Sequence, residues 1–201
     1  MKLLTHNKVY IRFLTIWLLC LILFFLGWFI GFHFLPEGIL ANKLPSAGIG
    51  LGGGGFNLIF IKIFFFNLLV AGGMLTFANL FQVGRLPLGY IPIVAQWIGF
   101  GIFLGTNSFS VPMIGRANPS LRLFISSPGA FELTALTLLV ASTAGIGIFR
   151  QATWLGVKTY KLKKFSEIHL GMSELVMILL AVLLLFIGNW KEASSILQSG
   201  M

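Results

Sequence analysis

Five long apolar stretches, separated by shorter polar or glycine-rich segments, divide the chain. They cover about residues 13–35, 56–81, 86–105, 129–149 and 170–188. Each is close to or above the roughly 20 residues that a helix needs to cross the hydrocarbon of a bilayer. The first is longer than the apolar core of a signal peptide, so we expect it to be a retained helix. The pattern predicts an all-α, polytopic transmembrane helix bundle that forms one membrane domain over residues 1–201.

The composition agrees with this fold class. Of the 201 residues, 57% are hydrophobic and only 9% are charged, and the mean hydropathy is +0.96. A soluble domain carries roughly 25% charged residues, which it needs to cover its surface. We therefore expect an integral membrane protein with no separate soluble enzyme domain.

The positive charges predict an orientation. If the N-terminus is cytoplasmic and the chain crosses five times, nine of the 14 Lys and Arg residues lie inside, four lie outside, and Lys62 falls within a span. Cationic segments are retained on the cytoplasmic side, so we expect the N-terminus inside and the C-terminus outside. Five of the inner charges belong to a basic loop over residues 150–169: Arg150, Lys158, Lys161, Lys163 and Lys164.

The basic loop also contains Trp154, Tyr160 and Phe165. It could lie on the membrane surface with its lysines on anionic head groups. Alternatively, its charge only sets the topology, or it binds a cytoplasmic partner protein. Nucleic acid is not expected as a partner.

Lys62 and Glu132 lie inside apolar spans, where an ionised group costs roughly 2.5–3.5 kcal/mol. With 1.5 Å per residue, Lys62 lies roughly 9 Å and Glu132 roughly 5 Å from the outer side, so an ion pair between the second and fourth spans is one hypothesis. In the second hypothesis, Ser127 and Pro128 begin a helix whose dipole favours Glu132. Lys62 then extends independently to the membrane interface. A substrate or proton site is the third.

Other polar residues suggest how the helices pack. Glu174, at the inner end of the fifth span, has Arg85 and Arg150 as candidate partners, or it favours the start of its helix through the dipole. Asn67 and Asn79 lie about 120° apart on an ideal helix, and with Lys62 they spread polar groups around the second span. We therefore expect this span at the centre of the bundle.

Small residues predict close helix packing at Gly72–Gly73 and at Ala141-x-x-x-Gly145. The glycine-rich segment 36–55 lacks the Lys-Ser/Thr ending of a phosphate-binding loop. Cys20 is the only cysteine and lies in an apolar span, and the chain contains no Asp. We expect no catalytic residues, no metal site and no cofactor.

The segments "IFIKIFFFNLLVAGGMLTF", "IGFGIFLGTNSF" and "SSPGAFELTALTLLVASTAGIGI" resemble the stage II sporulation protein M family, over about residues 56–149. Family members have Pro-His-Gly at the start of the fourth span, then a hydrophobic pair, Glu and a small-residue-rich helix. The matching positions here are Gly129, Phe131, Glu132, Leu133 and Ala135. Pro128 and Ser127 occupy the positions of the family's His and Pro, so a role of that imidazole does not carry over.

The resemblance implies a multi-span protein of a bacterial cell membrane, or of an internal membrane where the organism has one, that acts through partners. In sporulating bacteria such proteins look like scaffolds for a peptidoglycan-degrading complex. We expect a scaffold or complex subunit without catalytic activity, bound to other membrane proteins or to copies of itself. The alternative is a small transporter or channel component that uses the polar groups of the second and fourth spans.

Overall fold

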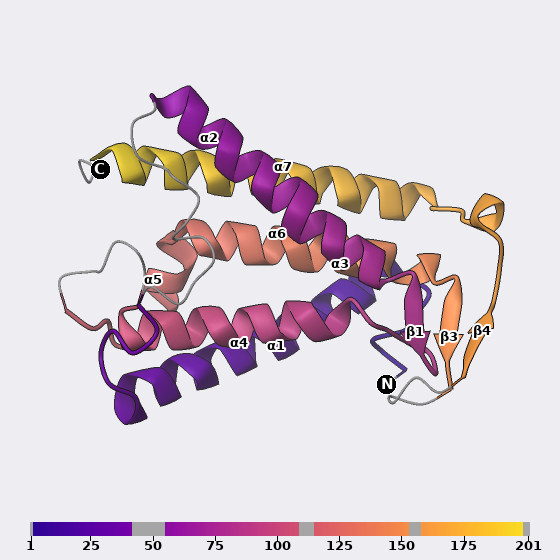
Figure 1. Ribbon diagram of the computed structural model, residues 1–201, viewed down its shortest axis with the longest axis horizontal. Helices are drawn as coiled ribbons and strands as arrows, with labels where there is room; N and C mark the ends of the chain where they lie inside the picture. Colours follow the sequence, from indigo (N-terminus) through magenta and orange to yellow (C-terminus); the bar gives the residue numbers. More distant parts are fainter. Residues whose placement is uncertain (1, 42–54, 109–114, 153–157, 199–201) are drawn as a thin grey trace.

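The computed structural model describes residues 2–41, 55–108, 115–152 and 158–198. Within these residues four helical segments are long and apolar enough to cross a membrane: Val9–Phe34, Phe56–Ala78, Pro128–Ile146 and Met172–Gln198. The predicted class, an apolar helix bundle, is therefore confirmed. A fifth apolar helix, α4 (Tyr90–Thr106), has 17 residues and lies along the first (Figure 1).

The remaining helices follow the chain order. Helix α1 covers Val9–Phe34, and the second segment consists of α2 (Phe56–Phe65), the π-helix η2 (Phe66–Gly72) and α3 (Gly73–Ala78). A short α5 (Leu121–Ser126) precedes α6 (Pro128–Thr143), which continues as the 3₁₀ turn η3 (Ala144–Ile146). Helix α7 covers Met172–Gln198 and is ten residues longer than the predicted fifth span at its C-terminal end.

Helix α6 forms the centre of the bundle. In its most apolar window 72% of the residues are buried, against 22% for the segment Phe56–Ala78. The prediction that the second span is central is therefore wrong. Small side chains of α6 allow its neighbours to approach, and two indoles bond to it: Trp17 Nε1 donates to Thr134 Oγ1 (3.0 Å), and Trp97 Nε1 to Thr137 Oγ1 (2.8 Å).

Helices α1 and α4 run in the same direction and pack through glycines (Figure 1). A Cβ added at Gly101 would lie 2.2 Å from the Phe24 carbonyl oxygen, and one at Gly105 2.5 Å from that of Trp28. On α1, Gly27 and Gly31 face α4 in the same way. These contacts form two opposed G-x-x-x-G motifs, which are present in the sequence but were not predicted as helix contacts.

The helix ends follow the local sequence. Ser127 accepts a hydrogen bond from Ala130 N (3.3 Å) and Pro128 is the first residue of α6, which confirms the predicted start. At the same end of the bundle, Arg116 caps two helices that end side by side. Its guanidinium donates to the carbonyls of Gly31 and Leu35 at the end of α1 and of Gly105 near the end of α4.

A small sheet closes the other end of the bundle. Its strands are β1 (Phe81–Val83), β2 (Leu86–Pro87), β3 (Phe149–Gln151) and β4 (Thr159–Lys161), in the order β2-β1-β3-β4. Strand β1 is antiparallel to β2 and parallel to β3, with Phe81 opposite Phe149, and β3 is antiparallel to β4. Gly84, with φ +61°, forms the β1–β2 turn. The predicted second, third and fourth spans are therefore too long at this end.

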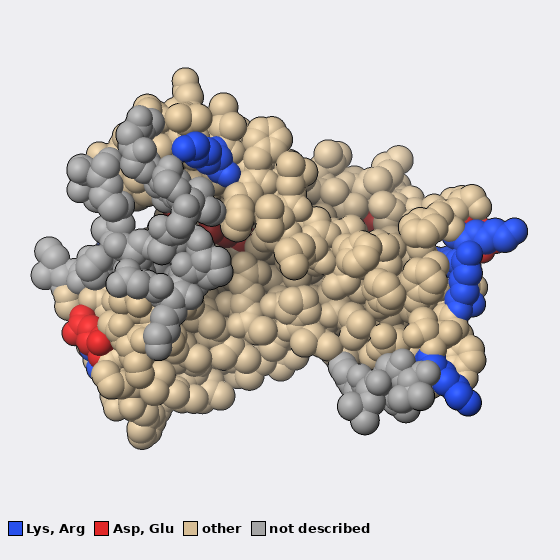
Figure 2. Space-filling model, viewed as in Figure 1, with Lys and Arg blue, Asp and Glu red and all other residues tan. Residues whose placement is uncertain are grey.

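Charge is distributed along the bundle as a membrane protein requires. Figure 2 shows Lys and Arg side chains gathered at the right-hand end, by the sheet, and a middle that is almost entirely uncharged on this face. The residues that carry the predicted inner charges all lie at this end: before α1, in the first turn of α1 (Arg12), or in the sheet and its connections. Most of the glycine-rich segment, residues 42–54 with Lys43, lies outside the described residues, as does Trp154.

Candidate functional site

The π-helix η2 decides where the polar residues of the second span point. A π-helix makes i→i+5 hydrogen bonds and turns less per residue than an α-helix. The rotation about the helix axis from Asn67 to Asn79 is therefore smaller by roughly 100° than in an α-helix of the same length. The two side chains were expected about 120° apart, but both contact α6. The second span consequently has one polar face, which explains how it can lie at the edge of the bundle.

Asn79 has a structural role. Its side chain is fully buried, and Nδ2 donates to the Val140 carbonyl (2.9 Å) and to Thr143 Oγ1 (2.8 Å). Its Oδ1 accepts from the backbone N–H of Gly89 (3.1 Å), just before α4. The side chain therefore joins three parts of the chain, and its amide atoms all have partners.

Asn67, the other polar residue of this face, belongs to a cluster of two carboxyl and two amide groups on three helices, which we call the carboxyl–amide cluster: Glu132, Glu192, Asn67 and Asn189. Asn67 Nδ2 donates to Glu132 Oε1 (3.2 Å) and to Asn189 Oδ1 (2.8 Å). The carboxyl groups of Glu132 and Glu192 are close neighbours. Asn189 is fully buried, and its Nδ2 has no partner among the described residues.

Glycines bring the helices of this cluster close together. A Cβ at Gly188 would lie 3.0 Å from Phe131 Cβ and 3.1 Å from Glu132 Cγ, so α7 needs a glycine where it crosses α6. The predicted site residue Gly129 serves a neighbouring contact, because a Cβ there would lie 2.2 Å from the ring of Phe100. Gly129 thus packs α6 on α4 and takes no part in the cluster.

The hypothesis of a Lys62–Glu132 ion pair is not supported by this geometry. Lys62 is exposed, whereas Glu132 is half-buried between Asn67 and Glu192. The physical reason is the direction of the second span, because at the level of Lys62 helix α2 packs on α7 and has moved away from α6 (Figure 1). The expected partner is replaced by a second carboxyl group.

Glu174 pairs with Arg12, not with the proposed Arg85 or Arg150. Arg12 Nη2 lies 3.3 Å from Glu174 Oε1, and Nε donates to the Ala141 carbonyl (3.0 Å). Its Nη1 also donates to the carbonyls of His6 and Asn7. Arg12 is buried, so one guanidinium ties the N-terminal segment, α6 and α7 together at the sheet end.

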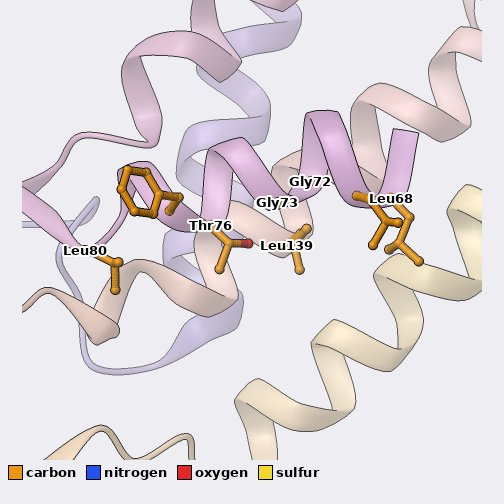
Figure 3. A pocket seen from close by; sticks show the side chains of 8 residues that line it. Leu68, Gly72, Gly73, Thr76, Leu80 and Leu139 are labelled. Atoms are coloured by element: carbon orange, nitrogen blue, oxygen red, sulfur yellow. The ribbon is translucent and has the colours of Figure 1, made fainter. Parts of the chain in front are cut away.

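Two apolar hollows lie on either side of α3 and η2, with volumes of about 470 and 500 Å³. Leu69, Gly73 and Phe77 line both hollows, and Figure 3 shows the first of them, with Thr76 as its polar side chain. Gly72 packs against Leu139 of α6, with 3.0 Å from an added Cβ to Leu139 Cδ2, as predicted for close helix approach. A Cβ at Gly73 would meet nothing within 4 Å.

Gly145 does not bring helices together. A Cβ there would also meet nothing within 4 Å, because α6 ends at Thr143 and Gly145 belongs to the 3₁₀ turn. The prediction that Gly145 of Ala141-x-x-x-Gly145 allows close helix packing is therefore wrong. Cys20 is fully buried inside the protein and does not face lipid.

The basic loop is a short hairpin followed by a 3₁₀ turn, η4 (Phe165–Glu167). Tyr160 and Phe165 are exposed, and Lys163 Nζ donates to the Gly145 carbonyl (2.9 Å). Arg150 lies in β3, and its buried Nε has no hydrogen-bond partner among the described residues. Lys158, Lys161 and Lys164 are exposed around the hairpin.

Glu192 and Asn189 were not predicted as site residues because the predicted last span ends at residue 188. The polar run "NWKE" resembles an exit from the membrane, but α7 continues to Gln198. Their spacing of three residues is the signal that could have found them, since residues i and i+3 share a helix face. Within the described residues, no group of three or more His, Cys, Asp or Glu side chains is placed to hold a metal ion.

Comparisons with protein-family models, curated proteins and solved structures find no match for this chain, so the resemblance to the stage II sporulation protein M family stays a prediction from the sequence.

Proposed function

We propose that the chain is a five-span bacterial membrane protein with a cytoplasmic N-terminus, and that it acts as a scaffold or complex subunit through protein partners. The observation that carries this proposal is the exposed glycine notch at Gly73, between two apolar hollows on the second span. The resemblance to stage II sporulation protein M agrees with such a role. No reaction of its own is proposed for the chain.

Two features support five spans and this orientation. Helix α4 is about 25 Å long at 1.5 Å per residue and lies along α1, which itself is long enough to span. Counting α4 as a span puts the sheet and its cationic residues on the side of the N-terminus. This is the side that the positive-inside rule assigns to the cytoplasm.

The notch suits a partner's apolar transmembrane helix. Helix association in a membrane gains little from hydrophobicity, because lipid is equally apolar, and depends on close backbone approach at small residues. Leu69, Gly73 and Phe77 are spaced by four residues and form one ridge, with the glycine as a gap in it. A helix that crosses at Gly73 would fill both hollows, and a second copy of the chain is the alternative source of that helix.

The cytoplasmic hairpin provides a second contact surface. Exposed Tyr160 and Phe165 lie beside exposed lysines, which is the combination that places a segment at an anionic membrane surface. We propose that this surface holds the sheet against the inner leaflet. Partner binding through the notch would then occur within the bilayer.

The test is partner capture by crosslinking and mass spectrometry after mild detergent extraction. Gly73→Leu fills the notch without an internal clash, because no atom lies within 4 Å of the added Cβ. Gly99→Leu is the matched control, since Gly99 is a helical glycine of α4 with equally open space. We expect Gly73→Leu to lose a stoichiometric partner that Gly99→Leu retains. A wild-type protein that extracts alone and monomeric would overturn the proposal.

A second candidate, a transport component, is favoured by the carboxyl–amide cluster, because ionisable residues within membrane helices often mark ion or proton pathways. Flux of protons or ions in proteoliposomes that Glu132→Gln abolishes and Gly73→Leu leaves unchanged would favour this function over the scaffold. Equal leakage in wild type, Glu132→Gln and protein-free vesicles would eliminate it.

A further inference from the structure

Arg150 lies at the centre of one face of the sheet, and part of its guanidinium lacks a hydrogen-bond acceptor. It is in register with Gln82 of β1 and with Tyr160 of β4, so these three side chains leave the sheet on the same face. The Arg150 side chain is half-buried, and its Nε is shielded from solvent without a partner among the described residues. Buried donors without acceptors are rare in proteins and indicate a ligand or an ordered water. Because a guanidinium only donates and is always charged, the ligand that satisfies it is an anion.

The glutamates at the sheet end do not neutralise Arg150. Two of the five acidic residues of the chain, Glu167 and Glu174, lie at this end. Glu167 Oε2 accepts from the backbone N–H of Lys164 (2.9 Å), and Glu174 pairs with Arg12. Nine Lys and Arg residues share the same end, where Figure 2 shows the cationic side chains gathered. This end therefore has an excess of positive charge that an external anion would balance.

The face that carries Arg150 changes from apolar to cationic along the hairpin. Beyond β3 and β4 the ladder continues at both ends, because Leu162 N donates to the Ile148 carbonyl (2.7 Å) and Ala152 N to the Lys158 carbonyl (3.1 Å). Side chains alternate between the faces of a sheet, so Leu162 and Lys158 lie on the same face as Arg150. Ile148 is fully buried at the bundle, Leu162 beside it is exposed, and Lys158 is exposed at the far end. This order, apolar, then guanidinium, then ammonium, matches the passage from acyl chains to head groups at a membrane surface.

We propose that Arg150 binds the phosphate group of one anionic phospholipid of the inner leaflet. The proposal rests on the proposed placement of the sheet at the cytoplasmic surface of the membrane, and it adds a defined head-group site to that surface. A guanidinium can donate two parallel hydrogen bonds to phosphate oxygens, one of them from Nε. Tyr160, beside it on the same face, has a hydroxyl that can donate to a further phosphate oxygen.

The side chains around Arg150 favour a lipid over a free phosphate ion. Leu162, Tyr160 and the neighbouring Phe165 are exposed large apolar or aromatic groups, and a small ion would leave them in water. A phospholipid covers them with its glycerol and acyl chains while its phosphate reaches the guanidinium. Exposed Lys158 on the same face selects an anionic head group, because it repels the ammonium of a zwitterionic one.

The test is a lipid titration of the purified protein in detergent, in which native mass spectrometry counts the bound molecules. The probes are dioctanoyl-phosphatidylglycerol, dioctanoyl-phosphatidylcholine and inorganic phosphate. We expect one phosphatidylglycerol to bind at least about tenfold more tightly than phosphatidylcholine, because only the anionic lipid keeps a net charge opposite to that of the site. Inorganic phosphate at the concentration of the lipid should not displace it.

The titration needs neither a partner protein nor a membrane orientation. Partner capture through the notch at Gly73 is a separate measurement, so each proposal can fail while the other stands. Lipid binding without partner capture would overturn only the scaffold, and partner capture without lipid binding would overturn only the head-group site.

Arg150→Gln is the diagnostic variant, and Lys161→Gln is its matched control. Arg150→Gln should bind phosphatidylglycerol at least about tenfold more weakly, because the charged donor is lost. Its unfolding temperature without lipid should not fall, since the shielded Nε has no partner to lose. Lys161→Gln removes the same charge from the same hairpin, but Lys161 is in register with Phe149, on the opposite face. We expect it to weaken binding by about threefold or less at about 0.15 M salt, which screens exposed charges.

Four results would overturn the proposal. They are equal losses of affinity in Arg150→Gln and Lys161→Gln, equal binding of the two lipids, displacement by inorganic phosphate, and wild-type affinity in Arg150→Gln. If Arg150→Gln fails to fold, Arg150→Lys decides, because it keeps the charge and loses the paired donors of the guanidinium. An affinity at least about fivefold below that of wild type would support the site, and an unchanged affinity would overturn it.

Discussion

The glycine contacts between α1 and α4 allow a quantitative prediction for Gly101→Ala. The added Cβ would lie 2.2 Å from the Phe24 carbonyl oxygen and 3.0 Å from the Trp28 nitrogen. Both atoms belong to the backbone of α1, so no side chain can rotate away. The helices must separate by roughly 1 Å to restore an ordinary contact, and such a gap removes a quarter to a half of the dispersion energy of each affected contact.

The expected cost follows from overpacking, which destabilises by about 1–3 kcal/mol and occasionally more. We expect the upper part of this range, about 3 kcal/mol, because the gap also opens at Gly27, Gly31 and Gly105. Alanine is the better helix former by about 1 kcal/mol, so the net destabilisation of Gly101→Ala should be about 2 kcal/mol.

Gly99→Ala is the matched control. It lies two residues away in α4 with no atom within 4 Å of an added Cβ, so it gains the same helix propensity without the clash. The free energy of unfolding of both variants can be measured in mixed micelles with increasing SDS, followed by tryptophan fluorescence. We expect the two variants to differ by about 3 kcal/mol. A difference below about 0.5 kcal/mol would show that the helices separate freely, and would refute the packing argument.

Five further variants, at Arg12, Glu174, Arg116 and Asn79, test the polar contacts by the same unfolding measurement. Arg12→Gln should lower the free energy of unfolding by about 3 kcal/mol, and Glu174→Gln by about 1 kcal/mol. The second cost is smaller because Arg12 keeps its three backbone acceptors in Glu174→Gln. Equal costs would mean that the ion pair alone matters. Arg116→Ala should cost about 2 kcal/mol of stability, because three carbonyls at two helix ends lose their donor. Arg116→Lys should recover part of this stability. Full recovery by Lys would contradict a role for the branched guanidinium. Asn79→Ala should cost about 2–4 kcal/mol, because it leaves a buried N–H of Gly89 and a cavity; a cost below about 1 kcal/mol would mean that water replaces the amide.

Apolar helices, and the first residues of several of them, can be predicted from local sequence patterns. Apolar length and scarcity of charge are properties of each segment alone, and capping is local too, so Ser127 and Pro128 identified the start of α6. The strands around residues 81–87 and 149–161 were absorbed into spans or loops because each has two or three residues. Such short strands form only when distant segments meet.

Which polar groups meet could not be predicted from local patterns, because it depends on how whole helices pack. An ideal helix placed Asn67 and Asn79 on different faces, but the π-helix between them turned both toward α6. The direction of α2 separated Lys62 from Glu132, and the crossing at Gly188 brought Glu192 to Glu132 from a helix sixty residues later in the chain. Local sequence specifies which residues need partners inside a membrane. The choice of partner depends on the rotation and crossing of whole helices, which arise from packing along their entire lengths.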